Sequence, residues 1–296
     1  FEKLENKTYY LTIVSDKDSL IYTIIKYEII NNIIVVKLDK FQEKEIFFKY
    51  KYDSKKIAQF RWNYINSFEY KYFLKYEGIL YGAAYGIIFC AFLYYLIIFF
   101  STRMNCFLYY SLMQLFVLLS LVGFMYFSYH SYLSSIYQAL VDAAETLSFL
   151  FTLLFAQAIL KTKEKMPTIH IFINIFILLN ILDLIAIFIY KYSILYIYVP
   201  FYIGFLIPTI AGAIAVIKGD KNALVYTIGW LVVCIFIYAA EHYLIPISGI
   251  YTVHIGAPLE SLIFSFALGY MLKILVKEKN EKEKLLIHQS KLASMG

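Results

Sequence analysis

Seven ionisable side chains interrupt otherwise apolar stretches of the sequence, and they are the residues best suited to chemistry. They are Asp142, Glu145, Asp183, Glu241, His242, His254 and Glu260. An ionisable group inside a membrane is costly and usually faces the interior of a helix bundle or a water-filled cavity. Carboxylates and histidines together can hold a proton, a cation or a small basic ligand, and a histidine can change its charge near neutral pH. We therefore take these residues as the candidate ligand-binding set.

The spacing of these residues does not follow a known catalytic or metal-binding motif. Asp142 and Glu145 are three residues apart and share one face of a helix. Glu241 and His242 are adjacent, so their side chains diverge by about 100°. No His-x-x-His or His-Glu-x-x-His spacing occurs among them, which argues against zinc hydrolysis. We predict no metal site, and the alternative to ligand binding is that these groups cap helix ends or satisfy one another.

The composition places most of the chain in lipid. Of the 296 residues, 61% are hydrophobic and 16% are charged, whereas a soluble domain is nearer half apolar and a quarter charged. The mean hydropathy is +0.66. Only Arg61 and Arg103 are arginines, so few bidentate phosphate contacts can form. Lipid is the expected surrounding, and nucleic acid is not an expected partner.

Seven apolar runs follow one another after residue 72, each close to the roughly 20 residues that a helix needs to cross a bilayer. They lie at about 77–100, 105–128, 137–160, 168–190, 193–217, 222–245 and 253–276. The short connections between them favour antiparallel neighbours. The sequence therefore predicts a membrane α-helical fold with a seven-transmembrane helix bundle over residues 73–276.

Basic residues predict the orientation of the bundle, because short cytoplasmic loops are enriched in lysine and arginine. The segments after the first, third, fifth and seventh runs contain Arg103, Lys161, Lys163, Lys165, Lys218, Lys221, Lys277, Lys279, Lys282 and Lys284. The alternate loops contain only Lys191. We expect the C-terminus in the cytoplasm and all seven ionisable residues in the outer half of the membrane, around a polar cavity open to the outside.

Residues 1–72 differ from the rest of the chain, and their pattern indicates β-structure. The stretch EIFFKYKYD alternates Phe48 and Tyr50 on one face with Lys49 and Lys51 on the other, which is the period of a half-buried strand. The pair Asn31-Asn32 suits a tight hairpin. We predict four or five antiparallel strands forming the C-terminal part of an extracytoplasmic β-sandwich.

Small residues mark one face of the first run. Gly78, Gly82 and Gly86 recur every fourth residue, and small residues on one face allow a neighbouring helix to approach closely. We expect this face to pack inside the bundle, with a dimer seam as the alternative.

The last apolar run continues into a charged segment, KEKNEKEKLLIHQSKLASMG, at residues 277–296. Glu278 precedes Lys282 in the favourable i, i+4 order. Leu285, Leu292 and Met295 continue a seam typical of a coiled coil. The sequence predicts a cytoplasmic coiled-coil helix that leaves the membrane as a rod.

Several stretches resemble one family of receptors. YEGILYGAAYGIIFCAFLYYLIIFFSTRMNCFLYYSLM in the first two runs and IGAPLESLIFSFALGYMLKILVKEK in the seventh resemble the bacterial 7TM-DISM family, seven-transmembrane receptors with diverse intracellular signalling modules. The strand TYYLTIVS resembles the end of the β-sandwich that precedes the helices in this family. The terminal QSKLASMG resembles the start of the dimerisation helix of a sensor histidine kinase.

The resemblance implies a membrane sensor of a bacterial two-component system. It implies a multi-pass protein of the inner membrane that forms a homodimer, detects an unidentified small extracytoplasmic ligand, and passes the signal to a kinase beyond Gly296. That kinase would use ATP and Mg²⁺, and its partner would be a response regulator. The phosphoacceptor would also lie beyond Gly296, so His288 does not take this role, and no catalytic residue or cofactor is expected within the chain.

Two alternatives stay open at this point. The same receptor could control another output, such as a cyclic-dinucleotide synthase. The acidic cluster could instead serve a small transporter or an intramembrane metal-dependent hydrolase.

Overall fold

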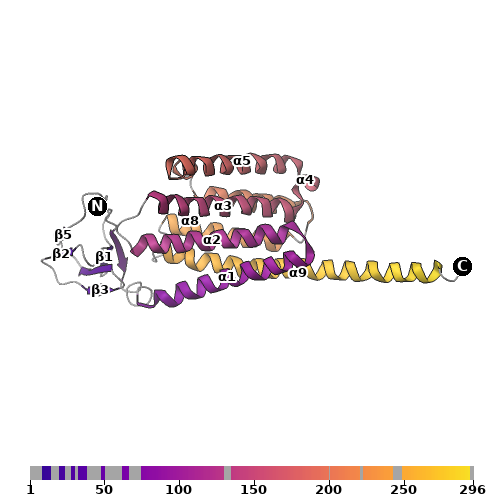
Figure 1. The fold of residues 1–296 in the computed structure, drawn as a ribbon, viewed down its shortest axis with the longest axis horizontal. Coiled ribbons are helices and arrows are strands. Elements are labelled where there is room, and N and C mark those ends of the chain that lie inside the picture. The colour runs from indigo at the N-terminus through magenta and orange to yellow at the C-terminus, as the bar shows by residue number, and fades with distance from the viewer. Residues whose placement is uncertain are drawn as a thin grey trace.

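A computed structural model shows short strands followed by a long helical bundle (Figure 1). The structure describes residues 9–14, 20–23, 28–30, 33–38, 48–50, 62–66, 75–129, 135–199, 201–220, 223–242 and 249–293. The strands gather at one end of the bundle, and the C-terminal helix projects from the other end.

The N-terminal part forms two antiparallel sheets. The strands are β1 (Tyr9–Val14), β2 (Leu20–Thr23), β3 (Glu28–Ile30), β4 (Ile33–Leu38), β5 (Phe48–Tyr50) and β6 (Trp62–Asn66). One sheet has the order β3-β4-β1-β6, and the other pairs β2 with β5. In the first sheet Thr12 lies opposite Val35 on one side and Asn63 on the other.

The strand count corrects the sequence prediction of four or five strands, since the described residues contain six. Of these, β3 is only three residues long, which is too short to show a clear alternation, whereas β5 lies within the alternating stretch EIFFKYKYD. Ile30 pairs with Ile33, so β3 and β4 are antiparallel neighbours, while the predicted turn at Asn31-Asn32 lies outside the described residues. The β-sandwich itself stays a prediction.

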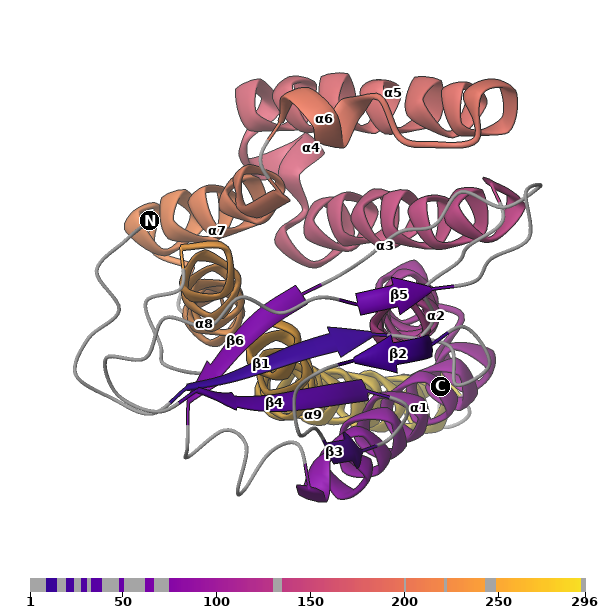
Figure 2. The same ribbon diagram turned by 90° about the vertical axis from the view of Figure 1, so that its left-hand side faces the viewer.

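The helices follow in an order that matches the apolar runs. They are α1 (Lys75–Thr102), α2 (Asn105–Tyr129), α3 (Ser135–Leu160), α4 (Thr162–Lys165), α5 (Pro167–Tyr190), α6 (Leu195–Tyr198), α7 (Phe201–Ile217), α8 (Ala223–Glu241) and α9 (Gly249–Ala293). Helix α9 packs against α8, α1 and α2, while α5 packs on the outside of α3. Figure 2 shows this arrangement along the bundle, with α5 at its edge.

Large apolar side chains cover the outside of the bundle, as expected of a multi-pass membrane protein. Ile171, Phe188 and Phe266 are all more than half exposed. Within the part of the chain that the structure describes, five helices are long and apolar enough to cross a membrane, over Gly78–Thr102, Asn105–Gly123, Ile136–Leu160, Pro167–Tyr190 and Thr252–Lys273. The apolar helices over Gly204–Ile217 and Ala223–Ala239 are shorter. Seven crossings therefore remain a prediction.

The fifth apolar run is not one helix, which corrects its predicted start at residue 193. The short α6 ends at Tyr198, and Val199 is extended with φ −113° and ψ 111°. A residue before proline disfavours the helical region, and residue 200 is a proline. Pro208, in contrast, lies inside α7 without ending it.

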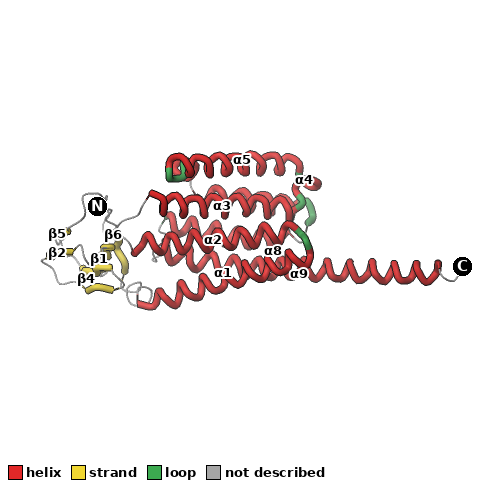
Figure 3. The backbone as a smooth tube through the Cα atoms, viewed as in Figure 1, coloured by secondary structure: helices red, strands yellow, loops and turns green. Residues whose placement is uncertain are grey.

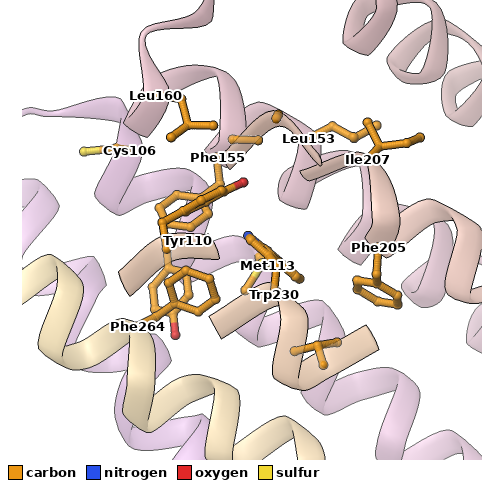
Figure 4. Packing of buried hydrophobic residues seen from close by; sticks show 14 of the residues in the cluster. Cys106, Tyr110, Met113, Leu153, Phe155, Leu160, Phe205, Ile207, Trp230 and Phe264 are labelled. Atoms are coloured by element: carbon orange, nitrogen blue, oxygen red, sulfur yellow. The ribbon is translucent and has the colours of Figure 1, made fainter. Parts of the chain in front are cut away.

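Aromatic rings fill the centre of the bundle. Phe264 on α9 is fully buried and lies 5.3 Å from Trp230 and 5.7 Å from Tyr110 between ring centroids. Phe155 meets it edge-on at 5.6 Å, a favourable arrangement for ring quadrupoles. Figure 4 shows these rings converging from different helices. The cluster joins α9 to α2, α3 and α8.

Basic residues end several helices. Arg103, Lys161 and Lys191 have φ of 57°, 48° and 69°, a left-handed conformation that costs a non-glycine residue about 1–2 kcal/mol. Positive charge at a helix C-terminus offsets part of this cost by complementing the macrodipole. Gly219 (φ 93°) ends α7 without that cost.

Helix α9 continues without a break for 45 residues. At 1.5 Å per residue it is about 68 Å long, more than twice the roughly 30 Å of a bilayer core. Figure 1 shows its C-terminal part extending alone past the other helices. Leu285, Leu286 and Ile287 are all more than half exposed there.

We expect Phe264→Ala to lower the free energy of unfolding by about 3–5 kcal/mol, because it opens a cavity within the aromatic cluster. The matched control is Phe266→Ala, two residues away on the same helix, where the side chain is 78% exposed. Thermal unfolding of both variants in the same detergent measures the difference. Equal loss in the two variants would contradict the assigned core.

Candidate functional site

The structure does not gather the predicted set of ionisable residues into one cavity. Asp142, Glu145 and Asp183 lie near one another between α3 and α5. Glu260 and His254 contact other helices from α9, as described below. Glu241 and His242 lie at the end of α8.

Asp183 is a buried acceptor that organises the connection after α5. Its Oδ1 accepts hydrogen bonds from the backbone N–H groups of Ile194 and Leu195, both at 2.9 Å. Its Oδ2 accepts from the hydroxyls of Ser193 at 2.7 Å and Thr146 at 3.1 Å. This carboxylate therefore satisfies the first N–H groups of α6, which have no partner within the helix. The connection is the green segment at the left-hand end of α5 in Figure 3.

Asp142 supports the same connection from α3. Its Oδ2 accepts a hydrogen bond from the Ser193 N–H at 2.8 Å, and its Oδ1 accepts one from the Gln138 side chain at 2.6 Å. Glu145, one turn further along α3, is half-buried. Both oxygens of Asp142 are thus engaged in holding the chain, so the geometry of Asp142 and Asp183 matches the alternative that these groups satisfy neighbouring polar groups.

Glu260 forms a polar contact between α9 and α2. Its Oε2 accepts a hydrogen bond from the Gln114 side-chain amide at 2.9 Å. Ser261 completes the group, because its hydroxyl donates to Gln114 Oε1 at 2.9 Å. Glu260 is 4% exposed, and Gln114 and Ser261 are buried as well. The three side chains join the two helices inside the bundle.

His254 forms a second polar contact, between α9 and α1. Its Nε2 lies 3.0 Å from the Tyr85 hydroxyl, and its ring lies 4.6 Å from the ring of Tyr81. His254 is fully buried. The Tyr85 hydroxyl also lies 3.3 Å from Met125 Sδ, which extends the contact to α2.

The remaining two predicted residues, Glu241 and His242, lie at the end of α8. Glu241 is the last residue of α8. His242 is exposed, with its ring stacked 4.1 Å from that of Tyr238. Among the residues that the structure describes, no three His, Cys, Asp or Glu side chains are grouped to hold a metal ion.

The glycine face of α1 does not pack inside the bundle, contrary to the first expectation. A Cβ atom at Gly78, Gly82 or Gly86 would meet no atom within 4 Å, and all three residues are exposed. The face that they form is open to lipid or to a second copy.

Sequence reasoning missed the uncharged partners in these contacts. Gln114 was detectable, because an amide in the middle of an apolar run usually bonds to another helix. Tyr81 and Tyr85 were not, because the chain has 30 tyrosines and nothing in their spacing sets these two apart.

Comparison with known proteins identifies the bundle. A family model described as "7TM diverse intracellular signalling" matches residues 77–271, from the start of α1 into α9. No curated protein and no solved structure gives a match.

We expect Asp183→Ala to destabilise the protein by roughly 3 kcal/mol or more, because it leaves buried N–H groups without acceptors. The exchange of the Ile194 and Leu195 amide hydrogens should accelerate in the same variant. The control is Asp220→Ala, which removes an exposed ion pair with Lys165 (2.6 Å) and should cost at most about 1 kcal/mol. Thermal unfolding and hydrogen-exchange mass spectrometry measure both effects. Unchanged exchange in Asp183→Ala would exclude the proposed capping role.

Proposed function

Because the chain belongs to the family of seven-transmembrane receptors with diverse intracellular signalling modules, we propose that it is the membrane sensor of a bacterial two-component histidine kinase. In this proposal a stimulus reaches the bundle from outside the cytoplasm, and α9 passes it to a kinase domain that follows Gly296. The kinase would bind ATP and Mg²⁺ and phosphorylate a response regulator. The chain itself carries the sensing and not the catalysis.

The continuity of α9 is the observation that carries this proposal. The helix begins at Gly249, runs through the aromatic core, and continues to Ala293. It has no loop between the membrane part and the charged part, so a rotation or shift of one end moves the other end. A helix that ended at the membrane surface could not transmit such a movement.

Two polar contacts join α9 to the neighbouring helices α1 and α2. Gln114 bonds to Glu260, and Tyr85 contacts His254, and both contacts lie within the first third of α9. A stimulus that breaks or strengthens either contact favours a different position of α9 relative to α1 and α2. Two such positions of α9 would form the two-state element that we propose for signal transmission.

The proposed orientation is supported by the position of the basic loops. The α3–α5 connection and the α7–α8 turn meet at one end of the bundle, where Lys165 pairs with Asp220 and Lys218 donates to the Lys165 carbonyl oxygen at 3.3 Å. Figure 1 shows α9 projecting from this same end. Positive charge favours the cytoplasmic side, so we assign the projecting helix to the cytoplasm of a bacterial inner membrane.

The same proposal includes a homodimer. The projecting part of α9 exposes Leu285, Leu286 and Ile287 to solvent, and a coiled coil with a second copy would cover part of this apolar surface. The open glycine face of α1 offers a second place for close helix approach.

The direct experiment measures phosphate transfer in the full-length gene product. Reconstituted in nanodiscs with ATP and Mg²⁺, the protein should incorporate acid-labile phosphate on a histidine beyond Gly296. Replacement of that histidine by alanine should abolish incorporation, whereas His288→Ala should retain it. Synthesis of a cyclic dinucleotide without phosphate incorporation would identify the alternative output and exclude the kinase.

A second prediction tests the rigid helix. Insertion of two alanines after Lys282 rotates everything downstream by about 200° and should change kinase activity severalfold, because the catalytic domains change their relative orientation. Insertion of seven alanines rotates the downstream segment by about 700°, which is only about 20° short of two full turns. The original orientation is nearly restored, so activity should return towards that of the parent. Identical activities for the two insertions would contradict transmission through a rigid α9.

A further inference from the structure

A small cavity lies inside the bundle beside Glu260. It has a volume of about 70 Å³, several times the roughly 10–15 Å³ that one water molecule requires and about half of an engineered cavity that holds benzene. Helices α2, α3, α7, α8 and α9 all contribute to its wall. The wall is mainly apolar and includes Val117, Leu121, Val233 and Ile237.

Two buried polar atoms of the cavity wall lack hydrogen-bond partners among the described residues. One is the acceptor Glu260 Oε1, and the other is the indole Nε1 of Trp230, an N–H donor that a cation cannot satisfy and that does not indicate the charge of an occupant. Glu260 is 4% exposed and Trp230 is 1% exposed. A buried acceptor without a donor destabilises the fold, and more so when it is charged. An unsatisfied group at a cavity is therefore a reason to expect an occupant.

The charge of the wall indicates what kind of occupant fits. The described residues of the cavity wall include no lysine, arginine or histidine, so no basic side chain among them neutralises Glu260. Gln114 supplies a neutral donor to Oε2 only. The hydroxyl of Tyr110 lies near this carboxylate, but it is not positioned to donate a hydrogen bond to Glu260 or to another described residue. A positively charged donor would satisfy Oε1 and neutralise the carboxylate together.

The rest of the cavity favours an organic cation over a metal ion. Apolar side chains cannot replace the hydration shell of a hard cation, which needs several oxygen ligands. They do suit a short alkyl chain. The ring of Trp230 can also attract a cation placed over its face. The volume admits only a few non-hydrogen atoms besides the charged group.

We propose that this cavity binds a small primary alkylammonium ion, with the ammonium group donating to Glu260 Oε1 and the alkyl chain against the apolar wall. The proposal names the ligand class of the sensor, and its signalling consequence rests on the proposed function. Binding itself requires only the chain described above. Because Glu260 is also bonded to Gln114, an ammonium ion there would act directly on the contact between α9 and α2.

Tryptophan fluorescence of the 296-residue chain in nanodiscs provides the test. The chain has two tryptophans, so Trp62→Phe leaves Trp230 as the only reporter. Titration with propylammonium chloride should give a saturable change in emission. Sodium chloride at equal ionic strength and propan-1-ol, which is similar in size but uncharged, should give none.

Variants identify the site. Glu260→Gln should weaken propylammonium binding by about tenfold or more, because a charged hydrogen bond is replaced by a neutral one. Ala257→Leu places a larger side chain in the cavity and leaves the carboxylate in place. It should abolish the saturable change in emission with propylammonium. Glu281→Gln is the matched control on the exposed part of α9 and should bind as the parent does. Thermal unfolding of each variant shows whether it is folded.

The outcomes separate this proposal from the proposed function. Absence of saturable binding, equal binding by Glu260→Gln, or equal binding of propan-1-ol overturns the cavity proposal, and the last two results would indicate an apolar site that ignores the charge. Binding as expected without any effect of propylammonium on the kinase activity of the full-length protein would leave the cavity assignment intact and count against its role in sensing.

Discussion

The hydrocarbon core of a bilayer cannot hydrogen-bond to a polar group, so each buried polar atom of this bundle depends on the protein for its partners. Asp183 shows how this constraint shapes the fold, because its carboxylate accepts four hydrogen bonds from Thr146, Ser193, Ile194 and Leu195. The chain leaves α5 and turns back at that point, where backbone N–H groups would otherwise lack acceptors. One buried acid thus makes a non-helical connection possible beside the membrane.

The same constraint gives Glu260 a different role. Its carboxylate has one oxygen bonded to Gln114 and the other without a partner among the described residues, next to a cavity. Asp183 is saturated by the chain, and we do not expect it to respond to a ligand. Glu260 has one oxygen, Oε1, without a hydrogen-bond partner among the described residues, and it lies at the contact between α9 and α2. A ligand bound to that oxygen would act on this contact.

The aromatic cluster around Phe264 and the polar contacts of α9 differ in their number of contacts and in how strongly each contact depends on direction. Burial of several large rings holds α9 in the bundle with many weak contacts, and such packing tolerates small shifts. The contacts of Gln114 with Glu260 and of Tyr85 with His254 are few and directional. In the proposed function, a change in one of them would select between positions of α9 without unfolding the core, and the uninterrupted helix would carry that change outward.

The sequence by itself determined the class of fold and the positions of the long helices, because the length of an apolar run and its flanking charges follow directly from the thickness and polarity of a bilayer. It also indicated the family. It could not separate Asp183 from Glu260, since both are acids in apolar runs. Nor could it show that Gly78, Gly82 and Gly86 face away from the bundle. Only the tertiary structure decided these points, because the role of a buried polar group depends on which partners other helices bring within hydrogen-bonding distance.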